Sequence, residues 1–144
     1  MSYPLCILVA NGSQARAFQR NAGREPLVQL AQWVHPQTRV HASELTFDHP
    51  GPGHAGRGGL APRVDIRHKA RSQFAQQLIH WIEARMAHQE MGCLALFASN
   101  PFLGELMVLL PQTLHQHVCA RHPTDLTSLP IQDLDHRLRH EFRL

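Results

Sequence analysis

Residues 47–78 read FDHPGPGHAGRGGLAPRVDIRHKARSQFAQQL. The first part of this stretch, residues 47–59, holds seven glycine and proline residues, which exclude a helix or a central strand. The second part predicts the start of a long helix. Five cations oppose a single carboxylate, Asp65, where the two parts meet; they are Arg57, Arg63, Arg67, Lys69 and Arg71. Because helix N-termini attract anions, this junction predicts a phosphate-bearing partner such as RNA.

The composition is that of a folded chain with an excess of positive charge. The 144 residues predict one domain, 1–144, with a long glycine-rich loop at about 36–64. The formal charge is +3, and Lys69 is the only lysine among the 14 basic residues. Arginine suits bidentate contacts with phosphate or carboxylate, which favours an anionic partner. A GC-rich coding sequence explains the same arginine bias equally well.

The sequence lacks the usual signatures of metal, cofactor and nucleophile sites. No HExxH motif, paired CxxC, P-loop, dinucleotide fingerprint or G-x-S-x-G elbow is present. We therefore predict no catalytic residue, no metal and no cofactor. The 12 histidines include two close pairs, His115 with His117 and His136 with His140. Either pair could hold a metal, but a solvated surface role is the expected one.

The three cysteines and the hydropathy indicate the compartment. Cys6, Cys93 and Cys119 are odd in number and widely spaced, so no disulfide framework is expected and a reducing cytoplasm is predicted. Cys93 and Cys119 are both expected to be buried, which argues against a cysteine nucleophile. No signal peptide is seen and no run reaches the length of a membrane span, so no membrane association is expected.

The order of expected elements predicts an α/β (α+β) fold. The strands are expected at Leu5–Ala10, Ala15–Gln19, Leu27–His35, Cys93–Ala98 and around Val118. The helices are expected from an N-cap at Asp65 to about His88, from an N-cap at Asn100 to Pro111, and from about Leu129 to Phe142. Together they form a mixed central sheet with an N-terminal three-strand meander and flanking helices.

Four separated stretches resemble a known bacterial family. They are ILVANGSQARAF (7–18), the segment FDHPG to FAQQL (47–78), LALFASNPFLGEL (94–106) and DLTSLP (125–130). In this order they resemble the host attachment proteins, described as required for attachment to host cells. Two positions depart from the family pattern: Asn11 stands where the family usually has Asp, and Met107 where it usually has Arg.

The host attachment family in turn resembles the middle domain of eukaryotic and archaeal peptide-chain release factors. That resemblance implies a mixed sheet with flanking helices and a G-R-G-G-Q loop that enters the peptidyl-transferase centre. This chain has Gly56-Arg57-Gly58-Gly59 followed by Leu60, so the glutamine that helps place a water is missing. The resemblance therefore favours a module that is not an enzyme.

Two candidate sites follow. The first is an RNA or phosphate site made of Arg57, Gly58, Gly59, Arg63, Arg67, Lys69 and Arg71, with a solvated loop and helix face as the alternative. The second is a polar site at the strand ends made of Asn11, Arg16, Ser99 and Asn100. For the second site, a hairpin turn and helix capping are the preferred interpretation.

Three functions remain open from the sequence. The first is a non-enzymatic, release-factor-like module that binds the ribosome or RNA through the basic glycine-rich loop. The second is a hydrolase acting on peptidyl-tRNA or RNA, in which a residue other than Leu60 places the water. The third is an indirect role in attachment to host cells. The oligomeric state is not predicted.

Overall fold

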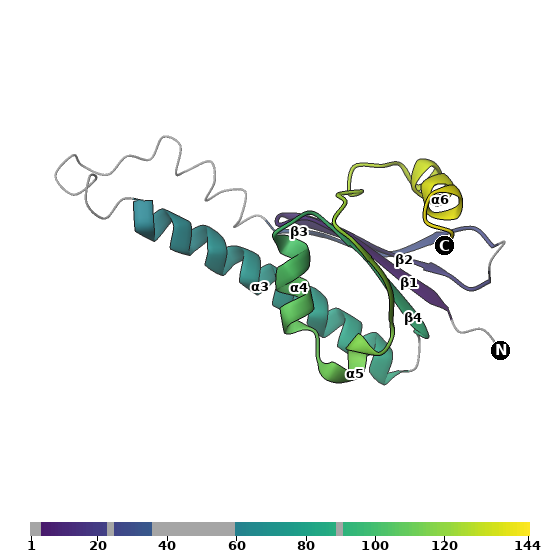
Figure 1. The fold of residues 1–144 in the computed structure, drawn as a ribbon, viewed down its shortest axis with the longest axis horizontal. Coiled ribbons are helices and arrows are strands. Elements are labelled where there is room, and N and C mark those ends of the chain that lie inside the picture. Colours follow the sequence, from purple (N-terminus) through teal and green to yellow (C-terminus); the bar gives the residue numbers. More distant parts are fainter. Residues whose placement is uncertain (1–3, 23–24, 36–59, 89–90) are drawn as a thin grey trace.

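The computed structural model describes residues 4–22, 25–35, 60–88 and 91–144, with the backbone alone for residues 60–65. Its centre is a five-stranded mixed sheet in the order β3-β2-β1-β4-β5 (Figure 1). The strands are β1 (Leu5–Ala10), β2 (Gln14–Arg20), β3 (Val28–Val34), β4 (Cys93–Ala98) and β5 (Val118–His122). β2 is antiparallel to β1 and β3, while β4 is parallel to β1 and β5. The predicted mixed sheet and its N-terminal meander are confirmed.

The two central strands are the two uninterrupted apolar runs of the sequence. β1 reads LCILVA and β4 reads CLALFA, and all but the first residue of each is buried. Strands that are covered on both faces are continuously apolar in this way. Their parallel register pairs Ala10 with Ala98, so both strands end at the same edge of the sheet.

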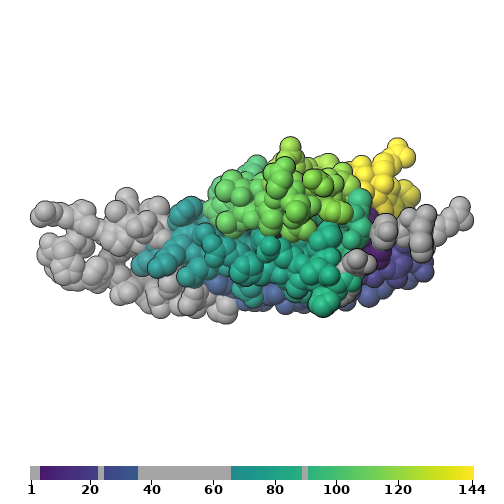
Figure 2. Space-filling model, turned by 90° about the horizontal axis from the view of Figure 1, so that it is seen from below, coloured from purple at the N-terminus to yellow at the C-terminus, as the bar shows by residue number. Residues whose placement is uncertain are grey.

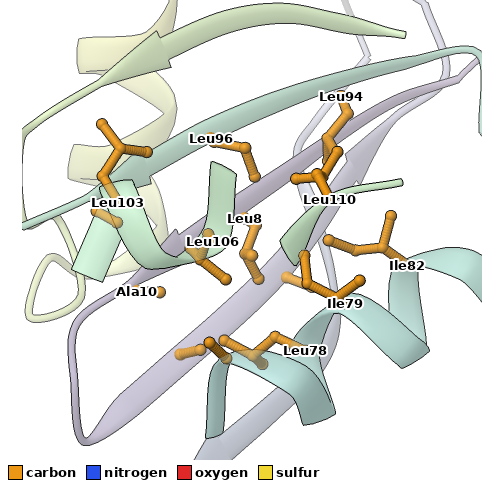
Figure 3. Packing of buried hydrophobic residues seen from close by; sticks show 14 of the residues in the cluster. Leu8, Ala10, Leu78, Ile79, Ile82, Leu94, Leu96, Leu103, Leu106 and Leu110 are labelled. Atoms are coloured by element: carbon orange, nitrogen blue, oxygen red, sulfur yellow. The ribbon is translucent and has the colours of Figure 1, made fainter. Parts of the chain in front are cut away.

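Helices cover both faces of the sheet and complete a three-layer α+β fold. The described helices are α3 (Leu60–Ala87), α4 (Phe102–Leu109), α5 (Gln112–His115) and α6 (Ile131–His140). α3, α4 and α5 lie on one face, and α6 lies on the other (Figure 1). On the first face, Leu8 and Leu96 of the sheet pack against Ile79 of α3 and Leu106 of α4 (Figure 3).

α3 begins earlier than the sequence predicted. It starts at Leu60, so Asp65 lies inside the helix and the predicted N-cap at Asp65 is wrong. Pro62 falls in the first turn, where the missing N–H and fixed φ of proline are tolerated. The expected loop at 36–64 is therefore shortened by its last five residues, while residues 36–59 lie outside the described part of the chain.

α4 also begins differently. Pro101 occupies the N-cap position with no side-chain hydrogen bond, and Asn100 lies one residue before it on the surface. The predicted N-cap at Asn100 is wrong. An N-cap at Asn100 would make Pro101 the first helical residue, whereas the helix begins at Phe102 and Pro101 is its N-cap. The end of α4 before Pro111 agrees with the prediction, and α6 lies within the range predicted for the last helix, with Leu134 and Leu138 buried.

α3 is longer than the face that it covers. At about 1.5 Å per residue its 28 residues span about 42 Å. The first side chain of α3 that is seen to be buried is Ala70, and the four before it, Ile66 to Lys69, are all exposed. The N-terminal part of the ribbon consequently extends beyond the sheet and α4 (Figure 1), and the first described side chains of α3 lie beyond α4 on the surface (Figure 2).

Candidate functional site

The projecting part of α3 carries exposed cations. Arg67 and Lys69 are both exposed, as are Ile66 and His68 beside them. Within the described residues neither Arg67 nor Lys69 forms an ion pair. The carboxylates that are ion-paired there, those of Glu105, Asp135 and Glu141, bind other side chains. These two side chains are therefore available to an external anion. We call residues 66–69 the basic segment of α3.

Arg71, the last of the five predicted cations, is placed differently. Its Nη2 lies 3.4 Å from Glu105 Oε1 of α4, and His68 Nδ1 lies 3.8 Å from the same oxygen. A Cβ added at Gly12 would lie only 3.1 Å from Arg71 Cδ, so Arg71 packs over the turn that follows β1. The charge of Arg71 is offset inside the molecule, which removes it from the freely available cations.

The other predicted members of the RNA site are not positioned. Arg57, Gly58 and Gly59 lie outside the described residues, and Arg63 is described by its backbone alone. Of the predicted RNA site, the structure therefore describes the side chains of Arg67 and Lys69, both exposed, and that of Arg71, which contacts Glu105. Arg67 and Lys69 are two residues apart on the helix, so they point to different sides of it.

Asn11 holds the turn at the end of β1. Its Oδ1 accepts hydrogen bonds from the backbone N–H groups of Ser13 and Gln14, each at 2.9 Å. Its Nδ2 donates to Asp125 Oδ2 at 3.0 Å and to Thr127 Oγ1 at 3.2 Å. Asn11 thus closes a local turn and also joins that turn to a segment more than 110 residues further along the chain.

Asp125 and Thr127 complete the same network. Asp125 Oδ1 accepts from the Thr127 backbone N–H at 2.9 Å and from its hydroxyl at 2.6 Å. Desolvation raises the pKa of Asp125, but the hydrogen bonds from Thr127 and Asn11 outweigh it and hold the pKa below its ordinary value. Arg16 Nη1 donates to the carbonyl oxygens of Thr127 and Leu129. These five residues, Asn11, Gln14, Arg16, Asp125 and Thr127, form the strand-end cluster.

The polar groups of the strand-end cluster are hydrogen-bonded mainly to one another. Gln14 Nε2 also donates to Thr127 Oγ1, at 3.2 Å, so every member is hydrogen-bonded to another or to a neighbouring carbonyl. The preferred interpretation of Asn11 as a turn residue agrees with this geometry. The cluster is suited to fixing the C-terminal segment onto the β1–β2 turn.

Ser99 and Asn100 do not join this network. The Ser99 carbonyl accepts from the Leu103 backbone N–H at 3.0 Å, and no side-chain hydrogen bond of Asn100 is seen in the described residues. Of the four residues predicted at the strand ends, Asn11 and Arg16 share a site, whereas Ser99 and Asn100 only lie at the same edge of the sheet. Asp125 and Thr127 were not among the predicted site residues, although both belong to the DLTSLP stretch.

An open pocket lies where α4, α5 and β5 meet. It is lined by Met107, His115, Val118, Cys119, Ala120 and Arg121. The expected burial of Cys119 is wrong, since this residue is exposed, and Cys93 is half-buried. Two effects raise the pKa of Cys119 to about 12: desolvation of its thiol and, second, the interaction with the neighbouring Cys93. The Cys119 thiol is therefore protonated at neutral pH and is a poor nucleophile, although His115 lines the same pocket.

The described part of the chain has neither a metal-ligand cluster nor a membrane-spanning helix. There, no three His, Cys, Asp or Glu side chains are grouped so as to hold a metal ion. In the same residues, no helix combines the length and the apolar character that crossing a bilayer requires.

The comparisons with known proteins bear on the whole chain. A search of curated proteins finds no match. Residues 6–138 match the family described as "Protein required for attachment to host cells". This match covers both the strand-end cluster and the basic segment of α3, and it extends over nearly the entire sheet. The chain therefore belongs to the family of proteins required for attachment to host cells.

Proposed function

We propose that this protein is a non-enzymatic module that binds RNA, on the ribosome, through the basic segment of α3. The observation that carries the proposal is the exposure of Arg67 and Lys69 without an ion-pair partner in the described residues. They stand on a part of the helix that projects past the sheet and α4 (Figure 1).

The chemistry of the segment fits a phosphate backbone. Arginine and lysine neutralise phosphates and release the counterions condensed on the nucleic acid, which makes such binding weaken as salt rises. After Asp65 the next acidic residue in α3 is Glu83, so the exposed side of the helix carries no carboxylate between Ile66 and Ile82. Glutamines at 73, 76 and 77 are exposed there and can add neutral hydrogen bonds.

The start of α3 bears on the choice between a binding module and a hydrolase. Leu60, which the release-factor resemblance aligns with the catalytic-loop glutamine, is the first residue of the helix. A leucine in a helical first turn has neither the amide nor the loop position that would help place a water. The ribosome is proposed because of the release-factor resemblance read from the sequence, and no observation on the described residues favours the hydrolase alternative.

A role in attachment to host cells would then be indirect. The family description links such proteins to attachment. An RNA-binding module would affect attachment by changing the synthesis of the proteins that contact the host. Protease treatment of intact cells tests this: the protein should resist digestion until the cells are lysed. Digestion on intact cells would contradict an indirect role.

Co-sedimentation with ribosomes on a sucrose gradient tests the proposal. We expect the wild-type protein to move with ribosomal particles at low salt and to be released at high salt. A variant with Arg67→Ala and Lys69→Ala should stay at the top of the gradient. The matched control is Arg121→Glu, which lowers the net charge by the same two units at an exposed position on β5.

The control decides what the loss of binding means. If Arg121→Glu still co-sediments, the effect belongs to the basic segment rather than to net charge. An equal loss of co-sedimentation in both variants would mean that binding depends only on the net charge of the protein. Failure of the wild-type protein to co-sediment at any salt concentration would contradict the proposal.

A further inference from the structure

α6 presents two histidines that face one another on the surface. His136 and His140 are four residues apart, one helical turn, and both are exposed. Their ring centroids lie 4.3 Å apart, with an angle of 40° between the ring planes. Residues at this spacing stand above one another on a helix, so the two imidazoles share one patch of surface.

The charged neighbours of these histidines are already paired. Arg137 binds Glu141 through two contacts of 2.8 and 2.9 Å, and Arg139 binds Asp135 at 3.0 Å. In the described part of the chain, by contrast, the only interaction seen for His136 and His140 is with each other. Their nitrogen atoms therefore have hydrogen-bonding capacity that no group among the described residues uses.

The helix that carries the pair is firmly held. Leu134 and Leu138 are fully buried against the sheet, and the buried Arg20 of β2 binds Asp135. The relative positions of His136 and His140 are consequently fixed by the helix, while each ring is free to turn about its own side-chain torsions. This is the property that a bidentate ligand requires.

The separation of the two rings favours binding of one metal cation over protonation of both imidazoles. Neutral imidazole binds Zn²⁺, Ni²⁺ and Cu²⁺ well, with metal–nitrogen distances of about 2.0 to 2.1 Å for zinc. Two nitrogens on one such cation lie about 3 Å apart, a separation within reach of rings whose centroids lie 4.3 Å apart. Two protonated imidazoles on the same patch would instead repel each other.

We propose that His136 and His140 form a two-histidine chelate for a divalent transition cation, with water molecules completing its coordination. No third His, Cys, Asp or Glu side chain in the described residues completes a metal cage there, so the site is open and reversible. The site is independent of RNA binding, because it lies on α6, on the opposite face of the sheet from α3.

Metal binding at this pair should stabilise the native protein. The unfolded chain does not hold the two imidazoles one helical turn apart, so the cation binds the folded state preferentially and raises its apparent stability. Mg²⁺ should have no such effect, because this hard cation prefers oxygen ligands to imidazole.

Calorimetric titration of metal-free full-length protein with Zn²⁺ is the first test. We expect a class of sites with a stoichiometry of one that is lost in His136→Ala and in His140→Ala, with affinity falling by about tenfold or more when the chelate becomes a single ligand. The matched control is His80→Ala, which removes an exposed histidine from α3 and should leave this class of sites intact.

Cu²⁺ locates the site directly, because it broadens the NMR signals of nearby amides. We expect broadening concentrated in residues 131–140 of the wild-type protein, and its disappearance from that helix in His136→Ala. Broadening that is absent from residues 131–140, or unchanged Zn²⁺ affinity in both histidine variants, would overturn the proposal. A thermal shift by Mg²⁺ equal to that by Zn²⁺ would also overturn it.

Discussion

The strand-end cluster and the basic segment of α3 look alike in sequence and differ in structure. Both are rich in polar side chains beside a glycine turn or loop. In the strand-end cluster, Asn11, Asp125 and Thr127 donate and accept hydrogen bonds among themselves. In the basic segment, Arg67 and Lys69 have no ion-pair partner among the described residues. Polar groups that are satisfied internally support the fold, and those that are not remain available to a partner.

The largest expected loss of stability comes from removing an internal partner of a buried cation. The side chain of Arg20 is only 2% exposed, and Asp135 is its carboxylate partner. Asp135→Ala would leave the buried guanidinium without that charge, which costs about 3 kcal/mol of unfolding free energy. Urea unfolding followed by circular dichroism measures the change. Asp133→Ala, which removes an exposed carboxylate from the first turn of α6, should cost only about 0.5 kcal/mol.

Equal losses in Asp135→Ala and Asp133→Ala would contradict the distinction between partnered and unpartnered charges. A further check uses Arg139, which binds the same Asp135 at 3.0 Å from a half-buried position. Its truncation to Ala should cost clearly less than Asp135→Ala, because Arg20 keeps its carboxylate.

A smaller loss is expected when the strand-end cluster is made repulsive. Asn11→Asp replaces a donor, 3.0 Å from Asp125 Oδ2, with a second carboxylate. Loss of the hydrogen bond and repulsion between two partly solvated charges should cost about 1 to 2 kcal/mol at neutral pH. The measurement is again urea unfolding, carried out as a series from pH 7 to pH 4.

The pH dependence between pH 7 and pH 4 should differ between the two proteins. Hydrogen bonds that outweigh desolvation lower the pKa of wild-type Asp125 below 3.8, so its contribution to stability persists over this range and is lost only at lower pH. In Asn11→Asp, repulsion raises the pKa of one carboxylate above its unfolded value, so the penalty disappears as pH falls towards about 4. The difference in unfolding free energy between the two proteins should therefore narrow on acidification. A constant difference across this range would contradict the assigned hydrogen bond.

Gly12→Ala should have a weaker effect on stability. The added Cβ would lie 3.1 Å from Arg71 Cδ, and the flexible arginine side chain can move by a few tenths of an ångström. We expect a cost of about 0.5 kcal/mol, with the contact between Arg71 and Glu105 lengthened. Thermal unfolding measures the cost, and a loss above about 2 kcal/mol would show that Arg71 is held rigidly.

The smallest effect on stability is expected from the basic segment itself. Arg67→Ala with Lys69→Ala removes two exposed side chains that contact neither the core nor a carboxylate in the described structure. The unfolding free energy should change by no more than about 0.5 kcal/mol. A clear loss of stability in this double variant would mean that the two cations have a structural role, as the polar residues of the strand-end cluster do. That result would contradict the distinction between the two regions.

Much of the fold follows from local pattern. The apolar runs LCILVA and CLALFA predicted the two central strands at their observed bounds, and a long helix was predicted where α3 buries Phe74, Leu78 and Ile82. Short-range periodicity is sufficient here, because burial on both faces makes a strand continuously apolar and burial on one face gives a helix an apolar stripe.

The partners of polar residues could not be predicted in the same way. Asn11 bonds to residues 114 and 116 positions away, and Arg71 contacts Glu105 of another helix. Such contacts depend on how the sheet brings distant segments together. The start of α3 was missed because Pro62 and the glycines before it resemble a continuing loop, although proline is tolerated in a first helical turn.

Fluorescence anisotropy of a labelled RNA oligonucleotide, measured over a series of salt concentrations, tests the central claim most directly. The wild-type protein should bind with an affinity that falls as salt rises. The double variant Arg67→Ala and Lys69→Ala should bind more weakly, with the slope of log affinity against log salt reduced by about 1.4 for a single strand. Arg121→Glu should keep the wild-type slope. An unchanged slope in the double variant would contradict the account, because the unpartnered cations of α3 would then not contact RNA.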